Sequence, residues 1–309
     1  MTLKTDTRVS PELERLIEKL HCRGRLRVWS IIFTIFGDAV EPRGGILSAG
    51  SLSTLLDRLR IEPGAVRAAL SRLAAEGWLE RTRRGRNSFY AMSPAGRRRM
   101  NIAITKVYSG SDPLWDGQWC LCLTPAENRP KREVRKQLLM ARGFVALTSS
   151  VFIQAKTDDV GVSDDHESDG TDGCVLFYGT TENTGNLCKM VSESVDLDGA
   201  QTAYATLIDN FQPLGKLLDS GKILTPLDAM AARTLLIHDF RRAVLKDPSL
   251  PANILGEDWK APAARKLTGA LYKKLLTASE TWLDGCSGGI DGPLPNSDPG
   301  LMQRFVKSH

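Results

Sequence analysis

The segment from Ala65 to Glu76 limits the fold of this chain more than any other. At 100° per residue its apolar positions fall within an arc of about 100°, the width of a helix face that packs on a core. These positions are Val66, Ala69, Leu70 and Leu73. The opposite face is small and basic and carries no acid: Arg67, Ala68, Ser71, Arg72 and Ala75. A helix surrounded by water usually mixes long side chains of both signs, so this pattern predicts a helix that lies against something negative.

The residues on either side of this helix complete a recognisable pattern. Residues 51–59 predict a short helix, and 61–64 predict a tight turn before the basic helix. After it, residues 78–83 and 88–93 are β-like, and Arg84-Gly85-Arg86-Asn87 between them predicts a hairpin turn beside Arg83. Two helices joined by a tight turn and followed by a basic hairpin are typical of a winged helix-turn-helix. In that motif the second helix enters the major groove and the hairpin contacts phosphates or the minor groove.

The charge distribution supports a nucleic-acid partner. Residues 1–107 hold 20 Lys and Arg against 10 Asp and Glu, whereas the rest of the chain holds 21 against 26. A basic first third joined to an acidic remainder indicates that only the first part meets a polyanion, and double-stranded DNA is the expected one. A solvated basic helix and hairpin in a domain that binds protein is the alternative interpretation.

Composition and length narrow the class of protein. The 309 residues are 42 % hydrophobic and 25 % charged, which is ordinary for a globular protein and excludes a fibrous repeat or a wholly disordered chain. At about 150 residues per domain the length suggests two domains, with three small ones allowed. The longest nearly apolar run, 28–36, is less than half of the roughly 20 residues that span a membrane. The N-terminus lacks the apolar region of a secretory signal, so we expect a cytoplasmic protein without a membrane partner.

Before the basic helix, residues 10–37 predict a helix that ends at Gly37, with a break near 23–25.

Beyond the hairpin, hydrophobic periodicity predicts two further regions. After a linker at 112–114, strands at 118–124, 144–154 and 173–180 alternate with helices at 131–142 and 186–194, which predicts a small α+β sandwich. The acidic segment 156–173 predicts a mobile loop. Three helices follow, at 199–218, 226–246 and 262–283, and the Gly- and Pro-rich tail 286–308 predicts poor order.

The sequence holds only weak motifs for catalysis, metal binding or cofactor binding. None of the six cysteines is spaced C-x-x-C, so buried thiols in a reducing compartment are expected. The four histidines share no metal-ligand spacing, and there is no phosphate-binding or dinucleotide fingerprint. Residues 285–289 match the string G-x-S-x-G, but no strand precedes them as a nucleophile turn requires. We therefore expect no catalytic residue, no metal and no cofactor, and a protein that is not an enzyme.

Two groups of side chains are candidates for a small-molecule site. Trp115, Trp119 and Trp259 are candidates for the walls of an aromatic site, although core packing explains tryptophans equally well. On one predicted helix near Trp259, a second group is a candidate for binding an anionic ligand: His238, Arg241 and Arg242. A structural network or a dimer contact is the alternative for these residues.

Four stretches together resemble the PaaX family of bacterial phenylacetate-degradation repressors. They are Gly64-Ala-Val-Arg-Ala-Ala-Leu-Ser-Arg-Leu with Gly77-Trp-Leu, Trp115-Asp-Gly-Gln-Trp, His238-Asp-Phe-Arg-Arg with Asp247-Pro-Ser-Leu-Pro, and Asp258-Trp259. The resemblance spans residues 23–283. It implies a winged helix-turn-helix DNA-binding domain (1–110), a ferredoxin-like α+β domain (111–197) and a helical effector and dimerisation domain (198–285), followed by the tail (286–309).

The resemblance also implies a function. It implies a homodimeric transcriptional repressor of an aromatic or related catabolic operon that binds a pseudo-palindromic operator. A small-molecule effector, either an aryl-CoA thioester or a free aromatic or heterocyclic compound, would release it. Carried over by position, the base-reading residues are Arg67, Ser71 and Arg72, and the hairpin residues are Arg84, Arg86 and Asn87. The acidic loop at 164–172 looks longer than the family pattern and the tail is additional, which puts the effector in question.

Two other classes stay open at this point. A DNA-binding module without a ligand would have the same basic first third. The second is a metal-dependent nuclease, since the ferredoxin-like fold is shared with nucleases; Asp116 is the carboxylate nearest the first predicted strand.

Overall fold

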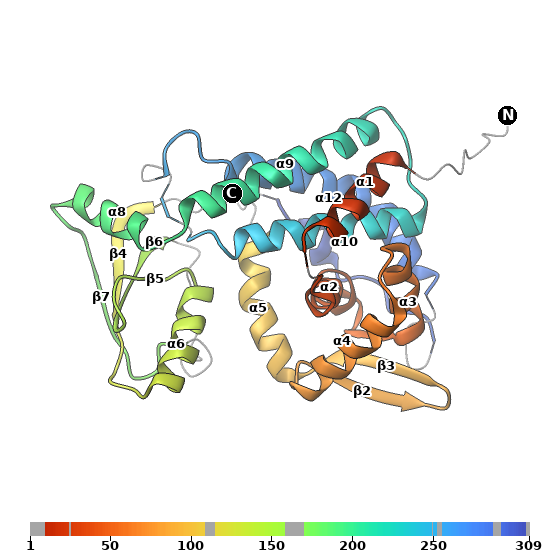
Figure 1. Cartoon of the computed structure of the whole chain (residues 1–309), viewed down its shortest axis with the longest axis horizontal. Coiled ribbons are helices and arrows are strands. Elements are labelled where there is room, and N and C mark those ends of the chain that lie inside the picture. Colours follow the sequence, from red (N-terminus) through yellow and green to blue (C-terminus); the bar gives the residue numbers. More distant parts are fainter. Residues whose placement is uncertain are drawn as a thin grey trace.

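The computed structural model describes residues 10–24, 26–108, 115–157, 170–248, 250–251, 255–286 and 292–306 (Figure 1). The predicted linker at 112–114 and most of the predicted loop at 156–173 lie outside these residues. Among the described helices, none has the length and apolar character needed to cross a membrane.

The part of the chain before the hairpin is helical apart from one short strand. In order it forms α1 (Pro11–Cys22), α2 (Val28–Ile35), the π-helical turn η1 (Phe36–Val40), the 3-10 turn η2 (Glu41–Arg43), β1 (Ile46–Ser48), α3 (Ala49–Arg58) and α4 (Pro63–Ala75). The Ser48 hydroxyl accepts a hydrogen bond from the Ser51 amide at 3.1 Å and so caps α3. The predicted helices at 51–59 and 65–76 are confirmed.

The prediction that the second helix ends at Gly37 is wrong. The helical path continues from α2 through η1 and η2 to Arg43. Gly37 is instead a point of close approach, because a Cβ atom there would lie 2.5 Å from the sulfur of Met100. A glycine that admits a distant side chain looks the same in sequence as one that ends a helix.

The first sheet carries the hairpin. β2 (Leu79–Arg84) pairs antiparallel with β3 (Asn87–Met92), and β1 lies on the other side of β3. The register runs from Leu79 opposite Met92 to Arg84 opposite Asn87, so the two residues between them form the turn. α5 (Pro94–Tyr108) follows and leads from the hairpin toward the rest of the molecule (Figure 1).

The second sheet is also antiparallel, with the order β5-β6-β4-β7. Its elements are β4 (Trp115–Leu123), α6 (Arg129–Ala141), β5 (Val145–Ala146), β6 (Val151–Thr157), β7 (Val175–Gly179) and α8 (Thr184–Glu193). Leu139 of α6 packs with Cys120, Cys122 and Phe152 on one face of this sheet. Val191 of α8 packs with Trp119 and Ile153 on the other.

The single strand predicted at 144–154 is wrong in detail, because the chain turns back on itself there. Thr148 accepts hydrogen bonds from the amides of Ser150 and Val151 through its side chain, and this turn separates β5 from β6. The two strands then pair antiparallel, with Val145 opposite Ile153.

Three long helices form the last part of the fold: α9 (Leu197–Asp219), α10 (Pro226–Val244) and α12 (Ala261–Asp284). α10 is central, since it packs against α9 and α12 and also against α1, α2, α3 and α5. One continuous hydrophobic cluster therefore contains both the N-terminal helices and the C-terminal helices. The expected class, a mixture of helices with small sheets, is confirmed by these two antiparallel sheets and the surrounding helices.

The prediction of a poorly ordered tail is wrong for its described residues. The 3-10 helix η3 (Pro299–Gln303) lies in the tail, and Leu294, Leu301 and Phe305 are buried in the shared core. The ring of Phe305 packs edge-on against Tyr108, with 5.4 Å between the ring centroids. Apolar residues spaced between Gly and Pro have no helical period, which is why the sequence hid this packing.

Candidate functional site

The outer face of α4 is exposed and basic, as predicted. The four predicted core residues Val66, Ala69, Leu70 and Leu73 are buried, whereas Arg67, Ser71 and Arg72 are exposed. No hydrogen bond or ion pair of Arg67 is found within the described part of the chain. The face is not free of acid, however, because Arg72 Nε donates to Glu76 Oε1 at 2.7 Å. Glu76 ends the predicted helix and lies one turn beyond Arg72, so the expectation of a basic face without an acid is wrong.

The hairpin holds its arginines on a tight turn. Gly85 has a φ of +58°, and the residue after it does not have a positive φ, which is the pattern of a type II′ turn. Arg83 Nε donates to the Gly85 carbonyl at 3.3 Å, and Arg81 donates to the Ser88 hydroxyl. The remaining predicted residues of the tip, Arg84, Arg86 and Asn87, are all exposed.

The hairpin and α4 are fixed to each other by contacts at their junction. The Ser93 hydroxyl donates to the Gly77 carbonyl at 2.6 Å and accepts from the Gly96 amide at 2.9 Å, so it caps α5 and ties β3 to the end of α4. Trp78 packs edge-on against Phe33 of α2 at 5.2 Å. Figure 1 shows α4 and the β2–β3 hairpin on the same edge of the molecule, away from α9.

Two of the predicted effector residues lie in the contact between α10 and α2. Arg241 Nη2 donates to the Ser30 hydroxyl at 2.7 Å, and its guanidinium lies 5.7 Å from the ring centroid of Phe33. His238 Nδ1 lies 3.2 Å from the Thr34 hydroxyl. Burial, assisted by nearby arginines, lowers the pKa of His238 to about 3, so the ring is neutral. Burial also lowers the pKa of Arg241, to about 10.

The structure does not bring the six predicted effector residues together. Trp115 and Trp119 pack edge-on at 5.2 Å within the second sheet's core. Trp259 packs on Tyr204 of α9 at 6.0 Å, and Arg242 is exposed on α10. His238 and Arg241 are at the α2 contact, so the six residues do not share one site.

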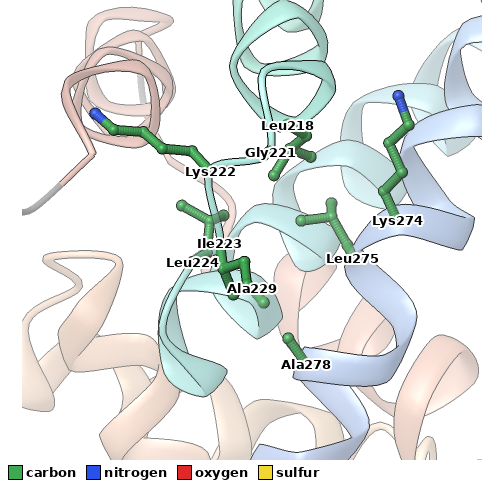
Figure 2. Close-up of a pocket in the computed structure, with 9 residues that line it drawn as sticks. All are labelled: Leu218, Gly221, Lys222, Ile223, Leu224, Ala229, Lys274, Leu275 and Ala278. Carbon is green, nitrogen blue, oxygen red and sulfur yellow. The ribbon is translucent and has the colours of Figure 1, made fainter. Parts of the chain in front are cut away.

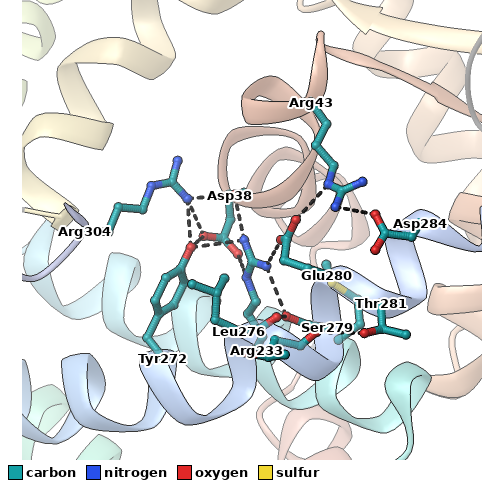
Figure 3. A network of polar contacts seen from close by, with 12 residues as sticks. Asp38, Arg43, Arg233, Tyr272, Leu276, Ser279, Glu280, Thr281, Asp284 and Arg304 are labelled. Atoms are coloured by element: carbon teal, nitrogen blue, oxygen red, sulfur yellow. Dashed lines mark hydrogen bonds and ion pairs between the residues drawn. The ribbon is translucent and has the colours of Figure 1, made fainter. Parts of the chain in front are cut away.

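A buried ionic network that the sequence analysis missed links the N-terminal helices to α10 and α12 (Figure 3). Asp38 of η1 accepts from Arg233 Nε at 2.7 Å and from Arg304 of the tail at 2.9 Å. Arg233 also donates to Glu280 Oε1 at 2.6 Å. Burial alone would raise the pKa of Asp38, but Arg233 and Arg304 hold it below its usual value. The signal in the sequence was an arginine within the apolar run 229–237.

A small pocket lies where α9 turns into α10 and faces α12 (Figure 2). Its volume is about 250 Å³, and the residues that line it include Leu218, Leu224, Ala229, Leu275, Lys222 and Lys274. No pattern in the sequence marked these positions, because they come from three separate segments.

Asp116, the carboxylate considered for a nuclease, is exposed and accepts a hydrogen bond from the Gln118 amide at 2.8 Å. It therefore caps a local turn. Among the described residues, no group of three His, Cys, Asp or Glu side chains is placed to hold a metal ion.

Comparison with known proteins gives consistent matches. Residues 27–96 match the model of the PaaX-like protein family, and residues 195–285 match the model of the PaaX-like protein C-terminal domain. The transcriptional repressor PaaX of Escherichia coli (strain K12) is 35 % identical over 283 residues, which cover 89 % of each chain. A solved structure of an uncharacterised protein from Mycobacterium tuberculosis aligns with 19 % identity and a TM-score of 0.46, over 76 % of this chain and 90 % of that one. A similarity at that TM-score supports no conclusion about function.

Proposed function

The chain belongs to the PaaX family, and on that premise we propose that it is a transcriptional repressor whose α4 and β2–β3 hairpin bind operator DNA. The observation that carries this proposal is the exposed basic edge formed by α4 and the hairpin, where Arg67, Ser71 and Arg86 all face solvent. The name of the Escherichia coli relative supports a regulator rather than an enzyme.

The proposal assigns a role to each part of the fold. α3, α4 and the hairpin form the winged helix-turn-helix, with α4 as the recognition helix. The second sheet, with its first strand between the third and the last, has the strand order expected of the ferredoxin-like domain. The helices from α9 onward form the effector and dimerisation domain, as expected for residues 198–285.

On DNA, we propose that a cytoplasmic homodimer places two α4 helices in major grooves about one helical turn apart, on a pseudo-palindrome. Arg67 and Ser71 then read base edges, Arg72 does so after leaving Glu76, and Arg84, Arg86 and Asn87 contact the backbone or the minor groove. This arrangement requires each protomer to hold its basic edge rigidly, and the bonds of Ser93 support that requirement.

Release by an effector would act through the contacts between α10 and the N-terminal helices. Arg241 binds Ser30 of α2, and Arg58 of α3 donates to Asp228 at the start of α10 at 2.5 Å. A ligand that prefers one arrangement of these helices by 1–3 kcal/mol would change DNA affinity about 5- to 150-fold. The proposed effector is an aryl-CoA thioester or a free aromatic or heterocyclic compound. The assignment of Trp115, Trp119, His238, Arg241, Arg242 and Trp259 to its binding site stays a prediction, which the separation of these residues in the fold does not support.

A mobility-shift titration tests the function. Purified protein is titrated against the DNA upstream of its own gene and against random DNA of equal length. We expect a sharp complex with the upstream DNA at concentrations well below those needed for random DNA, and its release by one member of a panel of aromatic acids and their CoA thioesters. Equal affinity for the two DNAs, or no complex at low salt, would reject the proposal.

A further inference from the structure

The pocket between α9, α10 and α12 has the form of a site for a small apolar group. Its walls are the side chains of Leu218, Leu224, Ala229, Leu275 and Ala278, and its volume is about 250 Å³. Ile223 lies at the same turn and is 89 % exposed. An apolar side chain left almost entirely in water at the edge of an apolar pocket is a surface that a ligand would cover favourably.

Two lysines give this pocket a positive rim. Lys222 lies on the turn and Lys274 on α12, and Figure 2 shows their side chains extending on opposite sides of the apolar walls. Lys274 forms an ion pair with Asp219. No hydrogen bond or ion pair of Lys222 occurs among the residues that the structure describes. The charged groups here are therefore two cations and one carboxylate, so the rim favours an anion.

We infer that this pocket binds the aryl group of the effector, with the anionic part of the same molecule held at the rim by Lys222, while Lys274 on the opposite side adds positive charge. The inference rests on the proposed function, because it names the ligand class through which the repressor is released. A cavity of about 150 Å³ accepts benzene, so this pocket has room for an aromatic ring and a short arm. A larger group, such as the nucleotide part of a CoA thioester, would lie outside the pocket.

The pocket is directly connected to the helices that bind DNA. Ala229 lines it, and the preceding residue, Asp228, accepts the hydrogen bond of Arg58 at the end of α3. Arg58 is also paired with Glu14 of α1 at 2.9 Å. A ligand that displaces the first turn of α10 therefore changes the position of α3, and α3 leads into α4 through residues 59–62.

Binding is tested by isothermal titration of the full-length protein with three probes. They are phenylacetate, its neutral analogue 2-phenylethanol, and phenylacetyl-CoA, so the free acid and the thioester are separate arms. Whichever anionic probe binds wild type, we expect Ala278→Leu, which fills the pocket, to weaken its binding by at least tenfold. We expect Lys222→Gln to weaken the binding of that probe about fivefold or more, since a charge-assisted bond is lost. The binding of 2-phenylethanol should stay the same.

Matched variants separate charge at the rim from general effects. Lys273 is exposed on α12 next to Lys274 and does not line the pocket, so Lys273→Gln should bind as wild type does. Asp219→Asn breaks the ion pair of Lys274 but keeps the lysine, so it should not weaken anion binding, whereas Lys274→Gln should. The inference is overturned if none of the probes binds wild type, or if Ala278→Leu and Lys222→Gln, with unchanged melting temperatures, bind as wild type does.

The same proteins in the mobility-shift assay distinguish the two proposals. If wild type binds probe, Ala278→Leu weakens that binding, and wild type does not bind its upstream DNA, the repressor proposal fails and the pocket stands. If wild type binds its DNA and a probe releases it equally well from the Ala278→Leu variant, the repressor proposal stands and the pocket is wrong.

Discussion

Arg233 of α10 and Asp38 of η1 form an ion pair of 2.7 Å between side chains that are 0 % and 1 % exposed. The two residues are 195 positions apart in the chain. This pair joins the turn after α2 to the central helix of the C-terminal part, and Glu280 and Arg304 extend it to α12 and the tail. The N-terminal helices are thus tied to the C-terminal helices by a buried charge network as well as by a shared core.

Replacing Arg233 by methionine is expected to destabilise the protein by about 3–5 kcal/mol, because it leaves Asp38 as a buried charge with one cation fewer. The measurement is urea unfolding followed by circular dichroism. In a double variant with Asp38→Asn, the additional loss should be well below that of a second independent site. A loss under about 1 kcal/mol for Arg233→Met would show that the network contributes little.

Because His238 is buried, the stability of the protein is expected to depend on pH. Its folded pKa of about 3 lies below the ordinary value of 6.5, since burial disfavours the charged ring. The unfolded chain therefore takes up a proton as the pH falls below 6.5, while the folded chain stays neutral until about pH 3. The contribution of the neutral ring to the free energy of unfolding is fully present above pH 6.5. It is lost as the pH falls toward 3, with a limiting slope of about 1.4 kcal/mol per pH unit.

The corresponding measurement is the free energy of unfolding of wild type and His238→Gln at pH 7, 6 and 5. The glutamine variant should lose this slope even if it is less stable at pH 7. Parallel curves for the two proteins would mean that His238 does not titrate on unfolding as expected. Asp38, whose pKa is lowered, adds its own acid dependence only near and below pH 4, so it does not obscure this range.

Local spacing was enough to predict α4, because its buried residues recur with the period of a helix and its boundaries carry Pro63 and Gly77. The hairpin was predictable for a similar reason, since its turn residues are adjacent. α4 and the hairpin each form from a few residues that are neighbours in the sequence. Together they carry the predicted DNA-binding side chains.

What the sequence could not reveal depends on contacts between distant segments. By its neighbours in sequence Gly37 predicts a helix end, but its role depends on Met100 of α5. The tail was expected to lack order, yet Phe305 packs into the core and Arg304 reaches Asp38. The pocket is assembled from α9, α10 and α12, so no single stretch of sequence carries its pattern.

Arg67 is expected to read a base. Arg67→Ala should weaken binding to the specific operator by about 1–3 kcal/mol and relax the preference at one base position, with a smaller loss on random DNA. Fluorescence anisotropy with both DNAs measures this. Arg15, which is exposed on α1, provides a matched control, since Arg15→Ala removes the same charge elsewhere. Equal losses on operator and random DNA would contradict base reading by Arg67.

Arg86 at the hairpin tip is expected to contact phosphate. Arg86→Ala should weaken binding to all sequences alike and reduce the slope of log affinity against log salt by about one. A salt titration between 50 and 200 mM, a range over which such contacts change affinity strongly, gives the slope for each protein. An unchanged slope would remove the hairpin from the interface.

Glu76 is expected to compete with DNA for Arg72, because its carboxylate accepts a hydrogen bond from Arg72 Nε at 2.7 Å on the face proposed to meet DNA. Glu76→Gln frees that cation and removes a negative charge, so it should tighten binding by about two- to fivefold, the range expected for an exposed pair. Because exposed charges are screened, the gain should shrink as salt is raised. Glu18→Gln on α1, also exposed, is the control for a change in net charge alone. Tighter DNA binding by both variants would point to overall charge as the cause. If Glu76→Gln binds DNA only as tightly as wild type does, Arg72 lies outside the interface.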